Sequence, residues 1–243
     1  MRKIVQGTVI VFILLAYGIA MAGQITDFSL KRIMDLSGIN KQVADYPASI
    51  IAVVEQSRKQ GLSISDVEFD EIKKSISDSF NPSLILKAIN TKVKKNMTEV
   101  EAKHLLRWYE SDEGRIITEA EKKASKPEAY NEMIEDAQSL LSNNTMIKIA
   151  NKIDTLVKST DFAMRLQHMA GMASFFAISK AKNPDAQLTT DSYNTQVADQ
   201  EKMIRKNIKQ LVILSYVYCY KDIDQKILEK YILFQKIQMH KKQ

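Results

Sequence analysis

The chain has 243 residues, of which 45% are hydrophobic and 26% are charged, and this composition excludes wholesale disorder. Seven Gly and four Pro are too few for the many tight turns of a β-sandwich or barrel, whereas abundant Lys, Glu, Leu and Ile favour helices. The single cysteine excludes an internal disulfide and a zinc site built from cysteines. We therefore predict an all-α protein.

Residues 1–22 have the pattern of a secretory signal peptide. Arg2 and Lys3 form a charged start, an apolar stretch follows, and the small residues of the sequence AMA precede a cleavage site after Ala22. The alternative is a retained membrane anchor, but the apolar stretch is shorter than the roughly 20 residues that a membrane span needs. We expect export by the general secretory route, to the periplasm or the medium.

The charge balance of the chain is mildly basic. The net charge is +6, and removal of Arg2 and Lys3 leaves +4. Export, and the lack of a basic stripe interleaved with aromatic residues, argue against nucleic acid as a partner. Acidic glycans and lipid headgroups, which make up an anionic envelope surface, fit a basic exported protein better. Cys219 is either buried or pairs between chains, and its apolar neighbours favour burial.

Helical signals follow one another from residue 27 with short breaks and no Gly/Ser/Pro-rich linker, which predicts one domain over residues 23–243. In the first half, Gly38 is placed to end the first helix, and Pro47 is expected in the first turns of the second helix or at a bend in it. Predicted helices begin at Asp27, Asn40, Ser65 (with Glu68 in a capping box), Asn81 (followed by Pro82) and Thr98.

In the second half, a short helix follows Ser111, and helical periodicity covers residues 125–141, 146–156 and 161–181. Residues 183–194, NPDAQLTTDSYN, read as a loop. A long helix runs to about Tyr220; a strand over residues 211–220 would have no neighbouring strand to pair with. Asp222 with Gln225 is expected to cap the last helix.

The segment 97–114, MTEVEAKHLLRWYESDEG, is the most distinctive part of the chain. It combines a capping box, an apolar helical stripe, an aromatic-Tyr pair and a Ser-x-x-Gly turn into a further helix. The residues of this motif are Thr98, Glu101, Leu105, Trp108, Tyr109, Ser111 and Gly114. Because the Ser111 hydroxyl can cap the second helix and Gly114 allows close helix approach, we expect the motif to serve packing rather than binding.

This motif resembles the exported bacterial family catalogued as domain of unknown function twenty fifty-nine. Members of that family show a Thr- or Ser-capped acidic helix, an aromatic-Tyr pair and a Ser-x-x-Gly turn. The match is close over residues 97–114 and weaker over residues 31–54. The resemblance implies an exported helical protein and carries over no particular chemistry.

The resemblance also implies a second, degenerate copy of the motif. A shift of 126 residues preserves the apolar stripe but not the Ser-x-x-Gly turn, since Gln235 to Ile237 continue the helix. The shift places Thr98 on Asp224, Leu105 on Tyr231, Leu106 on Ile232 and Trp108 on Phe234. We therefore predict two related helical units, over residues 27–142 and 146–243.

Two patterns could hold a metal ion. Glu101 and His104 have the Glu-x-x-His spacing of helical di-iron sites, but the second copy has Ile227 and Lys230 at those places, so capping explains Glu101 better. Met164, His168 and Met172 share one helix face and could offer soft ligands to Cu(I). The favoured interpretation of these methionines is flexible core packing, so we expect neither a metal nor a cofactor.

No catalytic signature is found: the sequence has no G-x-S-x-G, no glycine-rich phosphate loop and no Cys beside a plausible His. The last helix is basic and amphipathic, which allows peripheral membrane contact, although a helix that covers a core shows the same pattern. The sequence therefore predicts an exported, non-catalytic helical protein that binds a protein or an envelope component. A carrier of copper or of a small ligand is the alternative.

Overall fold

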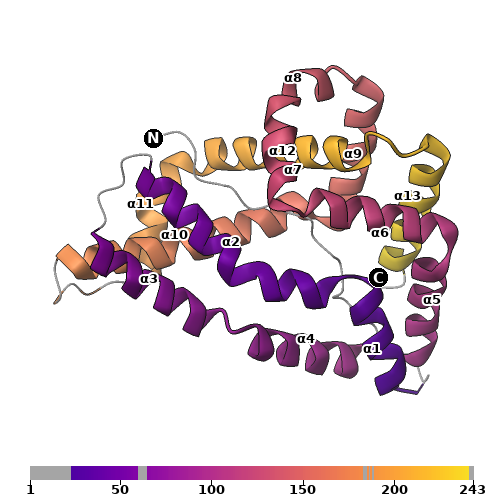
Figure 1. Ribbon diagram of the computed structural model, residues 1–243, viewed down its shortest axis with the longest axis horizontal. Helices are drawn as coiled ribbons and strands as arrows, with labels where there is room; N and C mark the ends of the chain where they lie inside the picture. Colours follow the sequence, from indigo (N-terminus) through magenta and orange to yellow (C-terminus); the bar gives the residue numbers. More distant parts are fainter. Residues whose placement is uncertain (1–22, 60–64, 183–184, 186, 188, 241–243) are drawn as a thin grey trace.

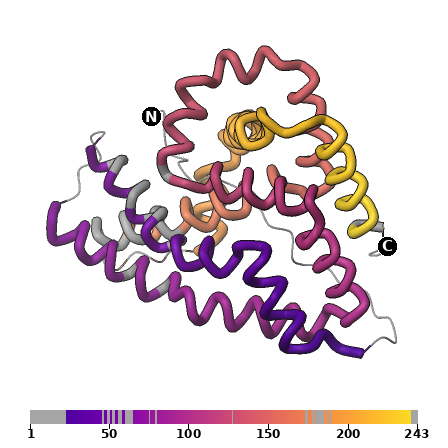
Figure 2. Tube along the Cα trace, turned by 45° about the vertical axis from the view of Figure 1, so that its right-hand side comes forward, coloured from indigo at the N-terminus to yellow at the C-terminus, as the bar shows by residue number. Residues whose placement is uncertain are grey.

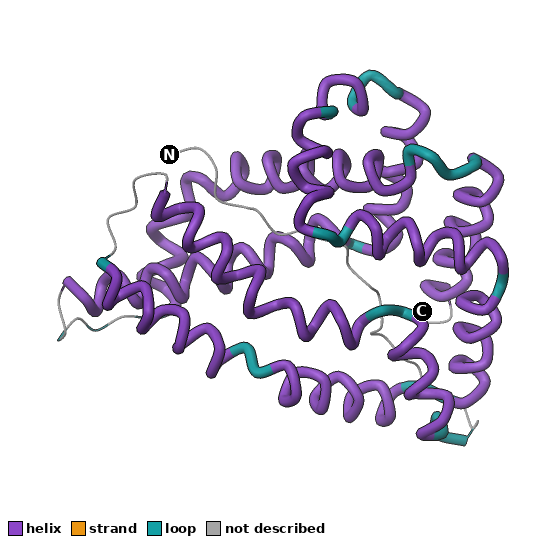
Figure 3. The backbone as a smooth tube through the Cα atoms, viewed as in Figure 1, coloured by secondary structure: helices purple, strands orange, loops and turns teal. Residues whose placement is uncertain are grey.

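The computed structural model describes residues 23–59, 65–182, 185, 187 and 189–240, and helices account for most of these residues (Figures 1 and 3). The only β-pairing in these ranges is an isolated bridge between Gln24 and Thr98. The all-α prediction is confirmed. The expected signal peptide and the basic end at Lys241 and Lys242 lie outside the described residues.

The helices of the first half are α1 (Asp27–Leu36), α2 (Ile39–Lys59), α3 (Asp66–Ser79), α4 (Pro82–Asn96), α5 (Glu99–Glu110) and α6 (Asp112–Ala124). Those of the second half are α7 (Pro127–Glu135), α8 (Ala137–Leu140), α9 (Asn144–Val157), α10 (Ser159–Lys182), α11 (Thr190–Val197), the 3₁₀ turn η1 (Ala198–Gln200), α12 (Glu201–Tyr220) and α13 (Gln225–His240).

Among the early helices, α1 packs against α2, α4 and α5, and α2 packs against α3 and α4. Among the late helices, α9 packs against α10, α12 and α13, and α10 packs against α11 and α12. Helix α6 touches both groups, because it packs against α5 as well as against α12 and α13. In Figure 1, α4 runs along the lower edge, α12 runs across the upper part, and α5 and α13 lie on the right. Figure 2 shows α12 nearly end-on.

The buried apolar side chains form two clusters. The smaller cluster lies between α1, α4 and α5 and is centred on Ile33, Val93 and Ala102. The larger cluster gathers side chains of α6 to α10 with those of α12 and α13. Phe234 of α13 packs against both clusters, so α13 contributes to the boundary between them.

Several helix ends match the local signals in the sequence. Gly38 follows α1 with a φ of +73°, a conformation that glycine adopts without a steric cost. The Ser65 hydroxyl and the Glu68 carboxylate form the expected capping box of α3. The Asn81 side chain accepts the first amides of α4, and Pro82 occupies its first position. Pro47, in contrast, lies inside α2, beyond its first turns.

Three expectations are corrected. The helix after Ser111 is not short, since α6 extends to Ala124. The expected loop over residues 183–194 contains the start of α11, because the Thr189 hydroxyl accepts the Ser192 amide and caps a helix there. The cap of α13 is Asp224 rather than Asp222, since the Asp224 carboxylate accepts the Lys226 amide at 2.8 Å. Within the described ranges, no helix is long and apolar enough to cross a membrane.

Candidate functional site

The start of α5 is capped as the motif predicts. The Glu101 amide donates to the Thr98 hydroxyl at 3.3 Å, and the Thr98 amide donates to the Glu101 carboxylate at 2.8 Å. This reciprocal pair satisfies two amides that no helical carbonyl can reach. Both side chains are therefore used in stabilising the helix start.

The corner between α5 and α6 depends on Ser111 and Gly114. The Ser111 hydroxyl donates to the Trp108 carbonyl at 2.7 Å and accepts the Gly114 amide at 3.0 Å. A Cβ at residue 114 would lie 1.8 Å from the Trp108 carbonyl oxygen. Since no side chain tolerates that distance without a backbone shift, the corner requires glycine. The structure thus gives both residues of the turn a packing role.

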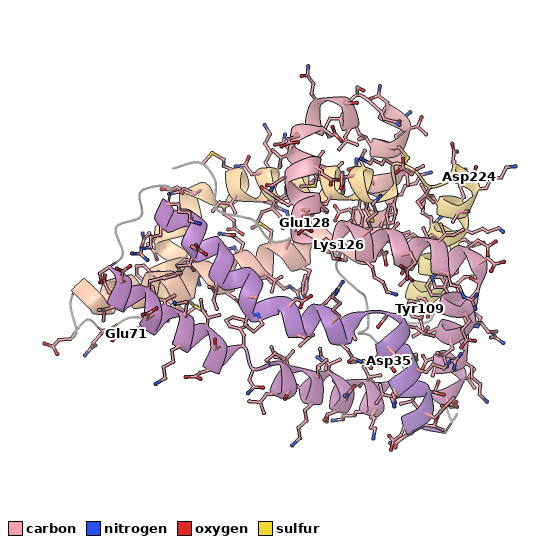
Figure 4. All side chains as sticks on the ribbon, viewed as in Figure 1. Asp35, Glu71, Tyr109, Lys126, Glu128 and Asp224 are labelled. Atoms are coloured by element: carbon pink, nitrogen blue, oxygen red, sulfur yellow. The ribbon has the colours of Figure 1, made fainter. Side chains whose placement is uncertain are left out.

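The aromatic pair of the motif joins α5 to its neighbours. The Trp108 ring stacks on the ring of Phe234 with centroids 4.5 Å apart, and on Tyr231 at 5.8 Å. Trp108 is only partly buried, and Tyr109, labelled in Figure 4, is also partly buried and packs against the smaller cluster. Leu105 is buried in that cluster. The aromatic contact therefore lies at the junction of α5 and α13.

The first described residues are tied to the start of α5. The Glu99 amide donates to the Gly23 carbonyl at 2.9 Å, and the Ile25 amide donates to the Met97 carbonyl at 3.1 Å. The Glu99 carboxylate accepts the Thr26 amide at 2.8 Å and the Ser29 hydroxyl at 2.7 Å. These hydrogen bonds lower the pKa of Glu99, the Thr26 amide having the largest effect.

A buried carboxyl that the sequence reasoning missed lies on α6. Glu121 is 6% exposed, and its Oε1 accepts hydrogen bonds from the Tyr220 hydroxyl at 2.8 Å and the Tyr231 hydroxyl at 3.3 Å. Burial raises the pKa of Glu121 to about 7, although the two tyrosine hydrogen bonds act in the opposite direction. This group can therefore gain and lose a proton near neutral pH inside the core.

A signal for Glu121 was present in the sequence. Glu121 follows Ile117 by four residues and precedes Ala124 by three, and this spacing places it on the apolar face of α6. A carboxylate on that face requires polar partners, and Tyr220 and Tyr231 supply them from more than 90 residues away in the chain.

Other polar side chains are buried close to the same tyrosines. Tyr216 stacks on Tyr220 at 5.9 Å, and its hydroxyl forms a hydrogen bond with Ser159. The carboxylate of Asp154 accepts both the amide and the hydroxyl of Thr160, each at 2.8 Å. These contacts join the end of α9 and the start of α10 to α12.

The copper candidates are placed on α10 with unequal exposure. Met164 is buried in the larger cluster, whereas His168 and Met172 are partly exposed. The His168 ring meets the Tyr193 ring edge-on at 6.1 Å, and its Nε2 lies 4.0 Å from the Glu201 carboxylate. Among the described residues no group of three or more His, Cys, Asp or Glu could hold a metal ion. The copper hypothesis stays a prediction.

The apolar stripe of α13 faces mainly inward. Leu228 is fully buried and Tyr231 nearly so, while Leu233 and Ile237 lie exposed beside the exposed lysines of the helix. Cys219 is partly buried, and burial first, then the Glu121 charge, raises the pKa of its thiol. The apolar stripe of α13 and the Cys219 side chain were both expected to be buried, and the structure agrees for most of the stripe and in part for Cys219.

Helix α4 presents the most uniformly basic surface of the early helices. Its 15 residues contain four lysines and no carboxylate. At 100° per residue, six exposed side chains share one face about 140° wide. These are Leu84, Lys87, Ala88, Thr91, Lys92 and Lys95. Lys94 lies to one side and pairs with Asp27 of α1. We call these six residues the α4 outer face.

No protein-family model matches the chain, and searches of curated proteins and of solved structures also return no match. The resemblance of residues 97–114 to an exported family therefore stays a prediction.

Proposed function

We propose that this chain is an exported, non-catalytic helical protein that binds an acidic component of the cell envelope through the α4 outer face. The observation that carries the proposal is the composition of that face. Lys87, Lys92 and Lys95 are exposed on one face of a helix that itself contains no carboxylate, and Leu84 on the same face is 64% exposed. A cationic face with an exposed apolar side chain suits an anionic surface that also has apolar material beneath its charges.

The strength of such a contact depends on its charges. Each lysine near an anionic surface contributes about 1 kcal/mol, and salt screens the attraction over about 8 Å at physiological ionic strength. Three lysines therefore support weak, salt-dependent binding. A cluster of this kind favours reversible attachment.

Two features support the export part of the proposal. Residues 1–22 carry the pattern of a cleavable signal. The carbonyl of Gly23, which would be the first residue after cleavage, accepts the Glu99 amide, so a chain cleaved after Ala22 keeps this hydrogen bond. Sequencing the N-terminus of protein recovered from the periplasm tests this, with Gly23 as the expected first residue.

We also propose that the chain contains two related units. When α5 is shifted by 126 residues, Ala102 falls on Leu228 (both 0% exposed) and Leu105 on Tyr231 (both 8% exposed). The neighbours correspond as well: α1 packs on α5 as α9 packs on α13, and α2 packs on α4 as α10 packs on α12. On this comparison the parts that correspond in the two units, residues 27–142 and 146–243, are α1 to α5 and α9 to α13, and α6 to α8 of the first unit have no counterpart.

The binding proposal is tested with a triple variant of the α4 outer face, Lys87→Gln, Lys92→Gln and Lys95→Gln. The purified protein is sedimented with phosphatidylglycerol vesicles and with isolated cell envelopes at low and at physiological salt. We expect the bound fraction of the unaltered protein to fall as salt rises, and the triple variant to lose most of its binding at low salt.

A matched control removes the same charge elsewhere. Lys202, Lys206 and Lys209 are exposed on α12. In Figure 1, α12 runs across the upper part, whereas α4 lies along the lower edge. Changing these three lysines to Gln should leave most of the binding. Equal losses in the two triple variants would show that only net charge matters and would overturn the assignment to α4. Binding to envelopes but not to vesicles would identify the acidic component as something other than phospholipid.

A further inference from the structure

Side chains from three helices meet at Glu121. Its Oε1 accepts from Tyr220 at the end of α12 and from Tyr231 of α13, and all three residues are buried. Helix α6, which carries Glu121, also packs against α5 of the smaller cluster. The contact therefore lies where the early helices are joined to the late ones.

The groups that face this carboxyl are neutral when it is protonated. From α12, Tyr216 and Cys219 are close enough for the Glu121 charge to add to the effect of burial in raising their pKa values. Tyr109 of α5 contributes to the raised pKa of Tyr231 and does not affect the pKa of Glu121. No titratable group of the described residues of α7 shifts the pKa of Glu121.

No basic side chain among the described residues compensates a negative charge at Glu121. On α6 itself, Lys122 and Lys123 are exposed, and Lys122 pairs with Glu119. A charged Glu121 would therefore have only two hydroxyl donors in an apolar interior. Such a site disfavours the ionised form.

We propose that Glu121 acts as a proton-dependent lock. Helix α6 packs stably against α12 and α13 while the carboxyl is protonated, and this packing weakens when the proton leaves, because the buried charge then has only the hydroxyls of Tyr220 and Tyr231 as hydrogen-bond donors. The lock makes the connection between the two groups of helices tighter in a mildly acidic compartment than in an alkaline one. It requires no ligand and no partner, so it is independent of binding by α4.

The sign of the pH dependence is set by linkage. The pKa of Glu121 is about 7 in the folded chain and 4.5 for an ordinary Glu. Between these values the unfolded chain has lost the proton and the folded chain keeps it, so stability falls as pH rises. The contribution is fully present below about pH 4.5 and is lost above about pH 7. A shift of this size corresponds to a change in the folding equilibrium on the order of 100-fold.

The test is urea unfolding of the purified protein between about pH 5 and pH 8, followed by the fluorescence of Trp108, the single tryptophan. We expect the folding equilibrium constant of the unaltered protein to fall on the order of 100-fold over this range. In Glu121→Gln, which cannot ionise, most of this fall should vanish. Hydrogen exchange, corrected for pH, should show faster opening of α6 above neutral pH.

The matched control is Glu119→Gln on the same helix, because Glu119 is exposed and its carboxylate pairs with Lys122. This variant should keep the pH profile of the unaltered protein. The proposal is overturned if Glu121→Gln also keeps that profile.

A second variant covers the case in which Glu121→Gln does not fold. The hydrogen bond from Tyr231 lowers the pKa of Glu121, so Tyr231→Phe should move the midpoint of the pH profile upward. Carbon-13 NMR of the glutamate carboxyls gives the same titration directly. A Glu121 midpoint at or below 4.5 in the unaltered protein would refute the lock.

Discussion

Helices α5 and α13 show the same burial at two pairs of residues 126 positions apart, but they differ at their ends. Ala102 and Leu105 of α5 are as buried as Leu228 and Tyr231 of α13, the residues found 126 positions later. Helix α5 ends at Ser111 and turns at once into α6, whereas α13 continues to His240.

This difference between α5 and α13 shows that separate residues of the sequence determine which face of a helix is buried and where the chain goes after the helix ends. An apolar stripe with helical spacing decides which face of a helix is buried, and it tolerates the exchange of Ala for Leu or Leu for Tyr. The path of the chain beyond the end of a helix depends on one or two residues. Ser111 and Gly114 make the corner after α5, and α13 has Ile237 and His240 at the corresponding places.

The largest effect is expected from Gly114→Val. The new Cβ would lie 1.8 Å from the Trp108 carbonyl oxygen, so the corner must open, at a cost of about 3 kcal/mol or more. Urea unfolding measures the loss. The control is Gly23→Val, since nothing lies within 4 Å of a Cβ at Gly23. A stable Gly114→Val protein would show that α5 does not need its corner and that the comparison with α13 is mistaken.

The next effect concerns the contact between the two helices. Trp108→Ala and Phe234→Ala each remove one of two stacked rings, and we expect each to destabilise by about 2 to 4 kcal/mol. Together they should cost less than the sum of the single losses, with a coupling of about 0.5 to 1.5 kcal/mol. Phe28 is 73% exposed, so pairing Trp108→Ala with Phe28→Ala should give additive losses. Additive losses for Trp108 and Phe234 would contradict the stacked arrangement.

The smallest effect compares the two helix caps. Thr98→Ala and Asp224→Ala each remove a side chain that accepts an amide at the start of α5 or α13, and each should cost about 1 kcal/mol. Thr155→Ala is the control, because Thr155 is exposed and its hydroxyl bonds only within α9. Thermal unfolding resolves such differences. A cost at Thr98 much larger than at Asp224 would mean that the capping box, rather than the single cap, stabilises α5.

Much of the fold was predictable because helix starts and apolar stripes are local. Ser65 with Glu68, Asn81 with Pro82 and Thr98 are recognised within four residues of sequence, and each caps a helix as expected. The start of α11 was missed since Thr, Ser, Asp and Asn favour caps and loops alike. Asp222 and Asp224 are equally good caps in sequence, and only the path of the chain between α12 and α13 (Figure 4) selects Asp224.

The candidate site was harder to predict because its partners come from distant parts of the chain. The spacing within α6 places Glu121 on the apolar face, but nothing local in the sequence identifies Tyr220 and Tyr231 as its partners. The copper candidates show the same limit of local reasoning, because sequence spacing alone does not give the exposure of each side chain. Met164, His168 and Met172 share one side of α10, but the neighbouring helices bury Met164 and leave the other two partly exposed.

The bonds at the N-terminal end bear on the order in which the chain can fold. Gly23 and Ile25 pair with Glu99 and Met97, more than 70 residues later, so these partners do not exist while the first part of the chain is being synthesised. During that interval residues 23–26 lack the contacts that anchor them in the finished protein. The anchoring of the N-terminal end must therefore wait until residues 97–99 have been made, and it cannot be the first step of folding.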